Sequence, residues 1–293
     1  MIILAGDIGG THSRIAYFAV EHHKINCIAE ESYRSADYES LDAIVTKFVK
    51  THPEEPVHAC FGVAGPVHDG RVKVTNLPWT VEASLLAREL GLRVTLINDL
   101  EAIAYSVRLL TPQDLAVLNE GDPSATGNAA VIAAGTGLGE AGLYWHAMDL
   151  IPFACEGGHT DFAPTNDLED ELLRYLRAQF GHVSWERVVS GMGLLSLYAF
   201  LRDTGRGARA DWIDFGATEE DPATQITRHG LDGTNSLCVQ VLEMFVSLYG
   251  NEAGSLALKM GPAASSSAAA LLREFLKSFV ARVSSPPLPQ RAG

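Results

Sequence analysis

Short apolar runs alternate with amphipathic stretches along the chain. Apolar runs bounded by polar or glycine-rich turns predict buried strands, at residues 2–6, 13–20, 57–63, 93–97 and 129–134. Apolar positions that recur about every 3.6 residues predict helices, at residues 41–51, 81–89, 100–110, 166–181, 192–201 and 236–250. Strands that alternate with helices indicate an α/β fold, in which ligands gather at strand ends.

One arrangement, a strand followed by a glycine-rich turn and a second strand, occurs twice. The first turn is DIGGTH at residues 7–12. The second is GTGLGEAG at residues 135–142, and we expect its return strand to begin at 143–146. The duplication predicts two related lobes that face one cleft.

The chain has 293 residues, more than one average domain. Its length and the repeated arrangement predict a small N-terminal α/β lobe at residues 1–110. A larger α/β lobe with helical insertions is expected at residues 111–260. Residues 261–293 then form an atypical tail of low-complexity, proline-rich sequence.

Composition limits the classes of function. The net charge of −14 argues against a broad surface that neutralises nucleic-acid phosphates. The four cysteines have no CxxC spacing, so neither a zinc site nor a disulfide framework is indicated. No segment has the roughly 18 uninterrupted apolar residues of a membrane span, and the N-terminus lacks the basic region of a signal peptide. We therefore expect a cytoplasmic protein.

Both glycine turns have the composition of phosphate-binding loops. Paired glycines let backbone N–H groups approach a phosphate without a Cβ in the way. In the first turn, Asp7 could hold a hydrated Mg²⁺ and Thr11 could donate a hydroxyl, although a plain hairpin with a capping Asp is an equal alternative. The second turn lacks the Lys of a Walker A loop, and the strand expected after it does not fit a dinucleotide fingerprint. As a pair, the turns favour two cradles for one polyphosphate.

Asn98 and Asp99 follow an apolar strand and precede a predicted helix. In this position Asp99 could be a common N-cap of the helix beginning at Leu100. Alternatively, it could be a general base that accepts the proton of an attacking hydroxyl during phosphoryl transfer.

The segment EGGH at residues 156–159 places a carboxylate and an imidazole around two glycines. Such donors and acceptors suit the hydroxyl groups of a polyol. Glu156 and His159 could also be metal ligands, but no third ligand completes a set. Glu186 is a further acceptor near a helix start, where an acidic residue is also ordinary.

Taken together, the chain resembles the bacterial glucokinase family, within the hexokinase and actin-like ATPase superfamily. The matching stretches are LAGDIGGTHSRIAYF (4–18), FGVAGPV (61–67), TNLPW (75–79), INDLEAIAYS (97–106), AAGTGLGEAGL (133–143), EGGHTDFAP (156–164) and GHVSWERVVSGMGLLSLY (181–198). They occur in family order and extend the resemblance to about Lys259. The related repressor/kinase group carries a cysteine-rich zinc motif after its EGGH-like segment, and TDFAP at 160–164 disfavours that group.

The resemblance implies two ribonuclease H-like, actin-like ATPase lobes flanking a cleft and phosphorylation of the glucose 6-hydroxyl by ATP, the first step of glycolysis. It implies Asp99 as the catalytic base, and as sugar-binding residues Asp99, Asn98, Glu156, His159 and Glu186. The phosphates of ATP would be bound by Asp7, Gly9, Gly10, Thr11, Gly135, Thr136 and Gly137. Mg²⁺, the implied cofactor, would be held at Asp7. The implied partners are glucose and ATP, and a homodimer is suggested by the resemblance alone.

The sequence departs from the family after NEAGSLALK at residues 251–259. There the family continues into a strand ending in GGGI, an adenosine-side turn, and a helix that returns to the N-terminal lobe. The residues at 261–293 match neither element, which leaves a second reading open. The protein could be a sugar-binding or regulatory relative of a glucokinase that has lost nucleotide binding. An actin-like structural ATPase is disfavoured, because such a protein has no need of EGGH or of the Asn98-Asp99 pair.

A shift of reading frame near residue 260 is our explanation for the departure. One back-translation of residues 263–276, read in another frame, gives RLFLGGGIAPRIL, which resembles the expected family segment. We predict that the DNA across codons 255–293 encodes this segment in a second frame. Sequencing that DNA is the measurement, and codons that cannot yield GGGIAP in any frame would refute the explanation.

Overall fold

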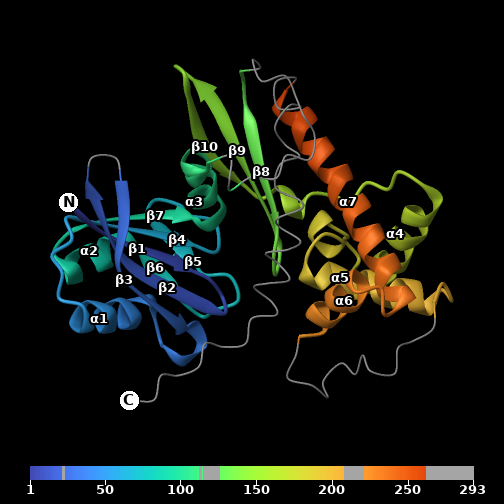
Figure 1. Cartoon of the computed structure of the whole chain (residues 1–293), viewed down its shortest axis with the longest axis horizontal. Coiled ribbons are helices and arrows are strands. Elements are labelled where there is room, and N and C mark those ends of the chain that lie inside the picture. Colours follow the sequence, from blue (N-terminus) through green and yellow to red (C-terminus); the bar gives the residue numbers. More distant parts are fainter. Residues whose placement is uncertain (22–23, 112–113, 115–125, 208–220, 262–293) are drawn as a thin grey trace. The chain divides into compact units, whose positions relative to one another are not determined.

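The structure is a computed structural model of the whole chain, and it describes residues 1–21, 24–111, 114, 126–207 and 221–261 (Figure 1). The chain divides into two compact units, Met1–Val107 (unit 1) and Arg108–Gly293 (unit 2). The predicted tail lies outside the described residues except for Gly261. No helix in the described ranges is long and apolar enough to cross a membrane. All four cysteines are free thiols, as the sequence indicates.

Unit 1 is built on a five-stranded sheet of order β3-β2-β1-β4-β7. The bounds of its strands are Ile2–Ile8 (β1), His12–Glu21 (β2), Lys24–Arg34 (β3), His58–Val63 (β4) and Arg93–Asn98 (β7). The strands β1, β2 and β3 are antiparallel neighbours, whereas β4 pairs parallel with β1 and β7 pairs parallel with β4. A small hairpin of Arg71–Lys73 (β5) and Thr80–Glu82 (β6) stands apart from this sheet.

The helices of unit 1 are Leu41–Thr51 (α1), Ala83–Leu90 (α2) and Asp99–Ser106 (α3), with a short 3-10 turn at Ser35–Asp37 (η1). A second 3-10 turn, Val107–Leu109 (η2), begins at the last residue of unit 1 and continues into unit 2. The prediction for α1 is confirmed at both ends. The helix predicted at 81–89 starts later, because residues 80–82 pair with β5 instead. The helix predicted at 100–110 starts one residue earlier, and its last turn is the 3-10 turn η2.

Unit 2 contains a three-stranded antiparallel sheet in its described part, in the order β10-β9-β8. Its strands are Ala129–Ala134 (β8), Leu138–His146 (β9) and Asp149–Cys155 (β10). The predicted return strand at 143–146 was placed too late, because β9 begins at Leu138 and its glycines pair with β8. The second glycine turn is therefore confined to residues 135–137.

Helices make up the rest of the described part of unit 2. They are Asp167–Phe180 (α4), Gly191–Asp203 (α5), Pro222–Leu231 (α6) and Ser236–Met260 (α7), with 3-10 turns at Gly157–His159 (η4) and Trp185–Arg187 (η5). Side chains of Asn166, Ser190, Asp221 and Asn235 cap the four helices by accepting backbone hydrogen bonds in the first turn. The long helix α7 continues past the predicted end at residue 250, because Glu252 and Leu256 continue its buried face.

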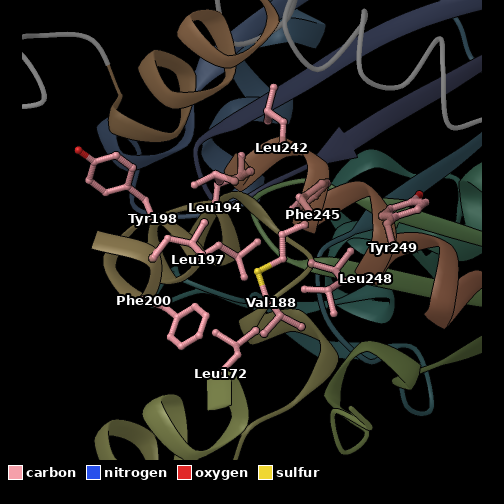
Figure 2. Close-up of a cluster of buried hydrophobic side chains, with 14 of the residues drawn as sticks. Leu172, Val188, Leu194, Leu197, Tyr198, Phe200, Leu242, Phe245, Leu248 and Tyr249 are labelled. Carbon is pink, nitrogen blue, oxygen red and sulfur yellow. The ribbon is translucent and has the colours of Figure 1, made fainter. Parts of the chain in front are cut away.

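Each unit has its own apolar core. In unit 1, Tyr17 and Phe61 of the sheet and Phe48 of α1 are fully buried in one cluster. In unit 2, α7 packs against α5 and α6. Figure 2 shows its side chains Phe245 and Leu248 in one cluster with Val188 and Leu194. The second core thus holds together the elements that carry residues 135–191.

Leu197 of α5 lies at 0% exposure in the core of unit 2 (Figure 2). We predict that Leu197→Ala lowers the free energy of unfolding by about 2–5 kcal/mol, because it removes buried methyl groups and leaves a cavity. The matched control is Leu258→Ala on α7, since Leu258 is 85% exposed. Denaturant unfolding of both variants is the measurement, and equal losses would contradict the assigned core.

Candidate functional site

The first glycine turn connects β1 and β2 at residues 9–11 and is fixed by backbone and serine contacts. Gly9 N–H donates to the His12 carbonyl (3.0 Å), and Ser35 donates its hydroxyl to the Gly9 carbonyl (2.9 Å). A Cβ on Gly10 would lie 3.1 Å from the Thr75 carbonyl oxygen, so a side chain there would press on the β5–β6 hairpin loop. This turn is therefore held tightly and needs glycine for a packing reason.

The carboxyl ends of the parallel strands β1, β4 and β7 meet at the same edge of the sheet in unit 1. Ile8 pairs with Val63, and Val63 pairs in turn with Asn98. Asp7 of β1 and Asp99, which directly follows β7, consequently lie at one edge, and only β4 separates the two strands. Ligands of α/β proteins gather at such an edge.

Asn98 and Asp99 stand at the start of α3 in different roles. The Asn98 side-chain oxygen accepts from the N–H groups of Leu100 (2.9 Å) and Glu101 (3.3 Å), and its amide donates to the Gly65 carbonyl (3.0 Å). The alternative that Asp99 is the cap is thus wrong, because Asn98 occupies that position. Asp99 is the first helical residue, is half-buried, and accepts from the Leu100 N–H at 2.9 Å.

Asp7 fits the requirements of a magnesium ion that is bound mainly through a substrate. Mg²⁺ typically keeps several waters and takes one or two carboxylates plus substrate phosphates. Asp7 is exposed beside the turn at 9–11. The part of the chain that the structure describes contains no group of three or more His, Cys, Asp or Glu side chains able to hold a metal by themselves. A single carboxylate together with phosphate oxygens is the arrangement that these residues allow.

The second glycine turn, at residues 135–137 in unit 2, lies against the N-terminus of α5. Gly135 N–H donates to the Gly137 carbonyl (2.7 Å), and Gly191, the first residue of α5, donates to the Gly135 carbonyl (2.8 Å). The positive end of a helix favours a nearby anion. This placement is consistent with a phosphate-binding role for residues 135, 136 and 137.

Glu186 joins this turn to the EGGH segment. One of its carboxylate oxygens accepts from the Leu138 N–H at 3.0 Å, and the other lies 3.9 Å from His159 Nδ1. A Cβ on Gly137 would overlap that carboxylate, so a larger residue there would displace the end of the Glu186 side chain. On its other side His159 Nε2 lies 3.7 Å from the Glu156 carboxylate. The structure therefore brings the three predicted sugar-binding residues of unit 2 together.

Backbone hydrogen bonds hold the two segments that supply these side chains. Trp185 N–H donates to the Thr160 carbonyl and Phe162 N–H donates to the Val183 carbonyl, both at 3.0 Å. Gly158 is buried, and a Cβ on it would overlap the Leu138 carbonyl. The glycines of EGGH thus allow the segment to lie directly on β9. The side chains of Glu156 and His159 remain 57% and 60% exposed, while that of Glu186 is 21% exposed.

Sequence reasoning missed one group near this cluster. Glu140 on β9 is 2% exposed and adjoins Gly157, although it stands in an ordinary-looking glycine run. No local signal reveals it, because residues 140–143 of β9 are all buried and show no alternation.

Comparisons with known proteins agree with these arrangements. A family model described as glucokinase matches residues 4–265. A glucokinase of Nostoc sp. is 40% identical over 278 residues, which cover 89% of this chain and 81% of the relative. A glucokinase of Yersinia enterocolitica is 35% identical over 259 residues, covering 88% and 76% of the two chains.

Solved structures give the same result for the fold. The crystal structure of a glucokinase from an Antarctic psychrotroph has a TM-score of 0.73 and 31% sequence identity, covering 98% of this chain and 90% of that one. A ROK family glucokinase from Streptomyces griseus, in complex with glucose and AMPPNP, has a TM-score of 0.58 at 20% identity and covers 89% and 81% of the two chains. The second likeness concerns the fold alone. The predicted α/β, actin-like ATPase fold is confirmed, and the chain belongs to the glucokinase family of ATP-dependent sugar kinases.

Proposed function

We propose that this chain transfers the γ-phosphoryl group of ATP to the 6-hydroxyl of glucose, giving glucose 6-phosphate and ADP at the first step of glycolysis. The observation that carries the proposal is the convergence of Glu156, His159 and Glu186 beside the glycine turn at 135–137. A polyol ligand and a phosphate ligand would thus be neighbours in unit 2. The relatives named glucokinase support the same substrates.

The sugar would be recognised by complementary hydrogen bonds. The carboxylates of Glu156 and Glu186 accept from hydroxyl groups, and the His159 imidazole can both donate and accept. Asn98 would add its second amide hydrogen, since the structure commits its oxygen to capping α3 and one N–H to Gly65. Each carboxylate bonded to a hydroxyl forms a charge-assisted bond, which is stronger than a neutral one.

Asp99 would act as the general base. As the glucose O6 forms its bond to the γ-phosphorus, the bond between that phosphorus and the bridging oxygen of ADP breaks, and the O6 proton passes to the Asp99 carboxylate. Loose transition states of this kind depend mainly on positioning. The first turn of α3 and the Asn98 cap hold Asp99 in place for this purpose.

The two glycine turns would bind the phosphates, through Gly9, Gly10 and Thr11 in unit 1 and Gly135, Thr136 and Gly137 in unit 2. Mg²⁺ at Asp7 would neutralise charge on the phosphate oxygens. Residues of both units would therefore contribute to one reaction. The cytoplasm is the expected compartment, and a homodimer remains a prediction from family resemblance.

A second candidate function follows from the departure after residue 259. If the GGGI-type turn is lost, contacts on the adenosine side are lost with it, and the protein would bind sugar without turnover. A coupled assay that detects glucose-dependent ADP release separates the two functions. Turnover supports the kinase, whereas glucose binding without ADP release at high ATP supports the sugar-binding protein.

We predict that Asp99→Ala lowers kcat by at least about 100-fold, because the proton acceptor is removed. Binding of ATP should be retained, since the residues proposed to hold the phosphates are unchanged. The measurements are steady-state kinetics and nucleotide binding by calorimetry, with exposed Asp37→Ala as the control. A rate close to that of the unmodified protein would remove Asp99 from its assigned role.

We predict that Glu156→Gln raises the KM for glucose about 10- to 100-fold, which corresponds to the loss of one charged hydrogen bond. The KM for ATP should change little, because Glu156 lies with the sugar-binding residues. Glu243→Gln on the exposed face of α7 removes an equal charge and serves as the control. An unchanged KM for glucose in Glu156→Gln would contradict the assignment of the sugar site.

A further inference from the structure

Two carboxyl groups are buried together in unit 2. Glu140 of β9 is 2% exposed and Glu252 of α7 is 0% exposed. Burial, together with the charge of Glu252, raises the pKa of Glu140 to about 7, and burial raises the pKa of Glu252 as well. Glu140 Oε1 and Glu252 Oε2 are buried without a hydrogen-bond partner in the part of the chain that the structure describes. Because the charges of two such buried carboxylates would repel each other, we expect the pair to hold one proton near neutral pH.

The pair lies directly beneath the predicted sugar-binding segment. A Cβ on Gly157 would overlap the Glu140 carboxyl, so this carboxyl fills the space that faces the segment. Glu140 also pairs across the sheet with Cys155, the residue before Glu156. We therefore expect a displacement of the Glu140 side chain to move residues 156–159.

Helix α7 carries Glu252, the second carboxyl group of the pair, and is bonded to the sheet. Tyr249, one turn before Glu252, donates its hydroxyl to the Ile132 carbonyl of β8 at 2.8 Å. Lys259 donates to Glu252 Oε1 at 3.3 Å from the same helix. The helix that carries Glu252 is thus bonded to the same sheet that carries Glu140.

We propose that Glu140 and Glu252 are positioning residues, which share one proton and hold the Glu156–His159 segment in its sugar-binding geometry. The proposal rests on the proposed sugar-binding function of that segment. It assigns no contact with the substrate to either carboxyl group.

Charge balance explains why one proton matters. The groups that face Glu140 are Glu252, Lys259 and Tyr249 of α7, Cys155 of β10 and, nearby, Glu156. With the proton present, Lys259 balances the single negative charge of the pair. Without it, two buried carboxylates face one ammonium group. Repulsion would then push the Glu140 side chain against Gly157.

The same proton links stability to pH. The folded-state pKa of Glu140, about 7, exceeds the ordinary value of 4.5 expected in the unfolded chain. The folded protein therefore binds the extra proton between these values, and its stability falls as pH rises through this window and levels off above it.

The experiment compares wild type with Glu252→Gln from pH 6 to pH 8.5. We predict that the wild-type KM for glucose rises about fivefold over this range, an effect the size of one ordinary hydrogen bond. In Glu252→Gln the added amide donates to an ionised Glu140, only one negative charge remains, and the KM should stay near its low-pH value. Other groups that titrate in this range act equally in both proteins. Glu243→Gln, an exposed position on the same helix, should follow the wild-type profile.

Thermal unfolding provides the readout that does not depend on sugar binding. Between pH 5 and pH 8 the wild-type midpoint should fall by a few degrees more than that of Glu252→Gln. If Glu252→Gln does not fold, Glu140→Gln carries the same test, because its amide mimics the protonated carboxyl.

The outcomes distinguish the positioning role of the carboxyl pair from the sugar-site assignment. Identical pH profiles of KM, accompanied by the expected difference in unfolding, would overturn the positioning role. Identical unfolding profiles would overturn the shared proton itself. If Glu156→Gln leaves the KM for glucose unchanged, the sugar-site assignment fails, whereas the unfolding comparison still decides whether the pair shares a proton.

Discussion

The Glu186 carboxylate is the contact on which the predicted chemistry of unit 2 depends. It binds the Leu138 N–H at the end of the glycine turn and faces His159 with its second oxygen. A larger residue at Gly137 would displace this carboxylate. The glycine turn at 135–137 and the EGGH segment, for which we propose phosphate and sugar binding, are thus linked through one side chain.

In unit 1, the Asn98 side chain joins two segments in a similar way. This side chain caps α3 through its oxygen and binds the Gly65 carbonyl through its nitrogen. It thereby ties the end of β7 to the loop that follows β4, at the edge where Asp7 and Asp99 also lie. A residue that the family resemblance assigns to sugar binding is at the same time a structural clamp, so its replacement would disturb Asp99 as well as the sugar.

The sequence allowed elements with a regular apolar pattern to be predicted, whereas β3, β10 and α6 have no predicted counterpart. Helix α1 was predicted at both ends because Leu41, Ile44, Val45 and Phe48 are spaced on one buried face. Strand β3 was missed because, as an edge strand, most of its residues are exposed and no clear alternation remains. The clustering of Glu156, His159 and Glu186 followed from family resemblance, since the hydrogen bonds between residues 160–162 and 183–185 join segments with no local signal of contact. The Glu140–Glu252 pair could not be predicted, because it depends on how α7 lies against the sheet.

The residues at the end of the family-like sequence remain part of the site's support. Lys259 balances the charge of Glu252, and the Met260 carbonyl accepts from the Asn128 amide at 3.1 Å. Asn128 in turn accepts from the Trp145 N–H of β9 at 2.9 Å, so the end of α7 is fastened to the sheet. The contacts that fasten α7 to the sheet are therefore complete within the described residues. We expect the effect of the altered tail on the nucleotide side, because the resemblance implies an adenosine-side turn beyond residue 259.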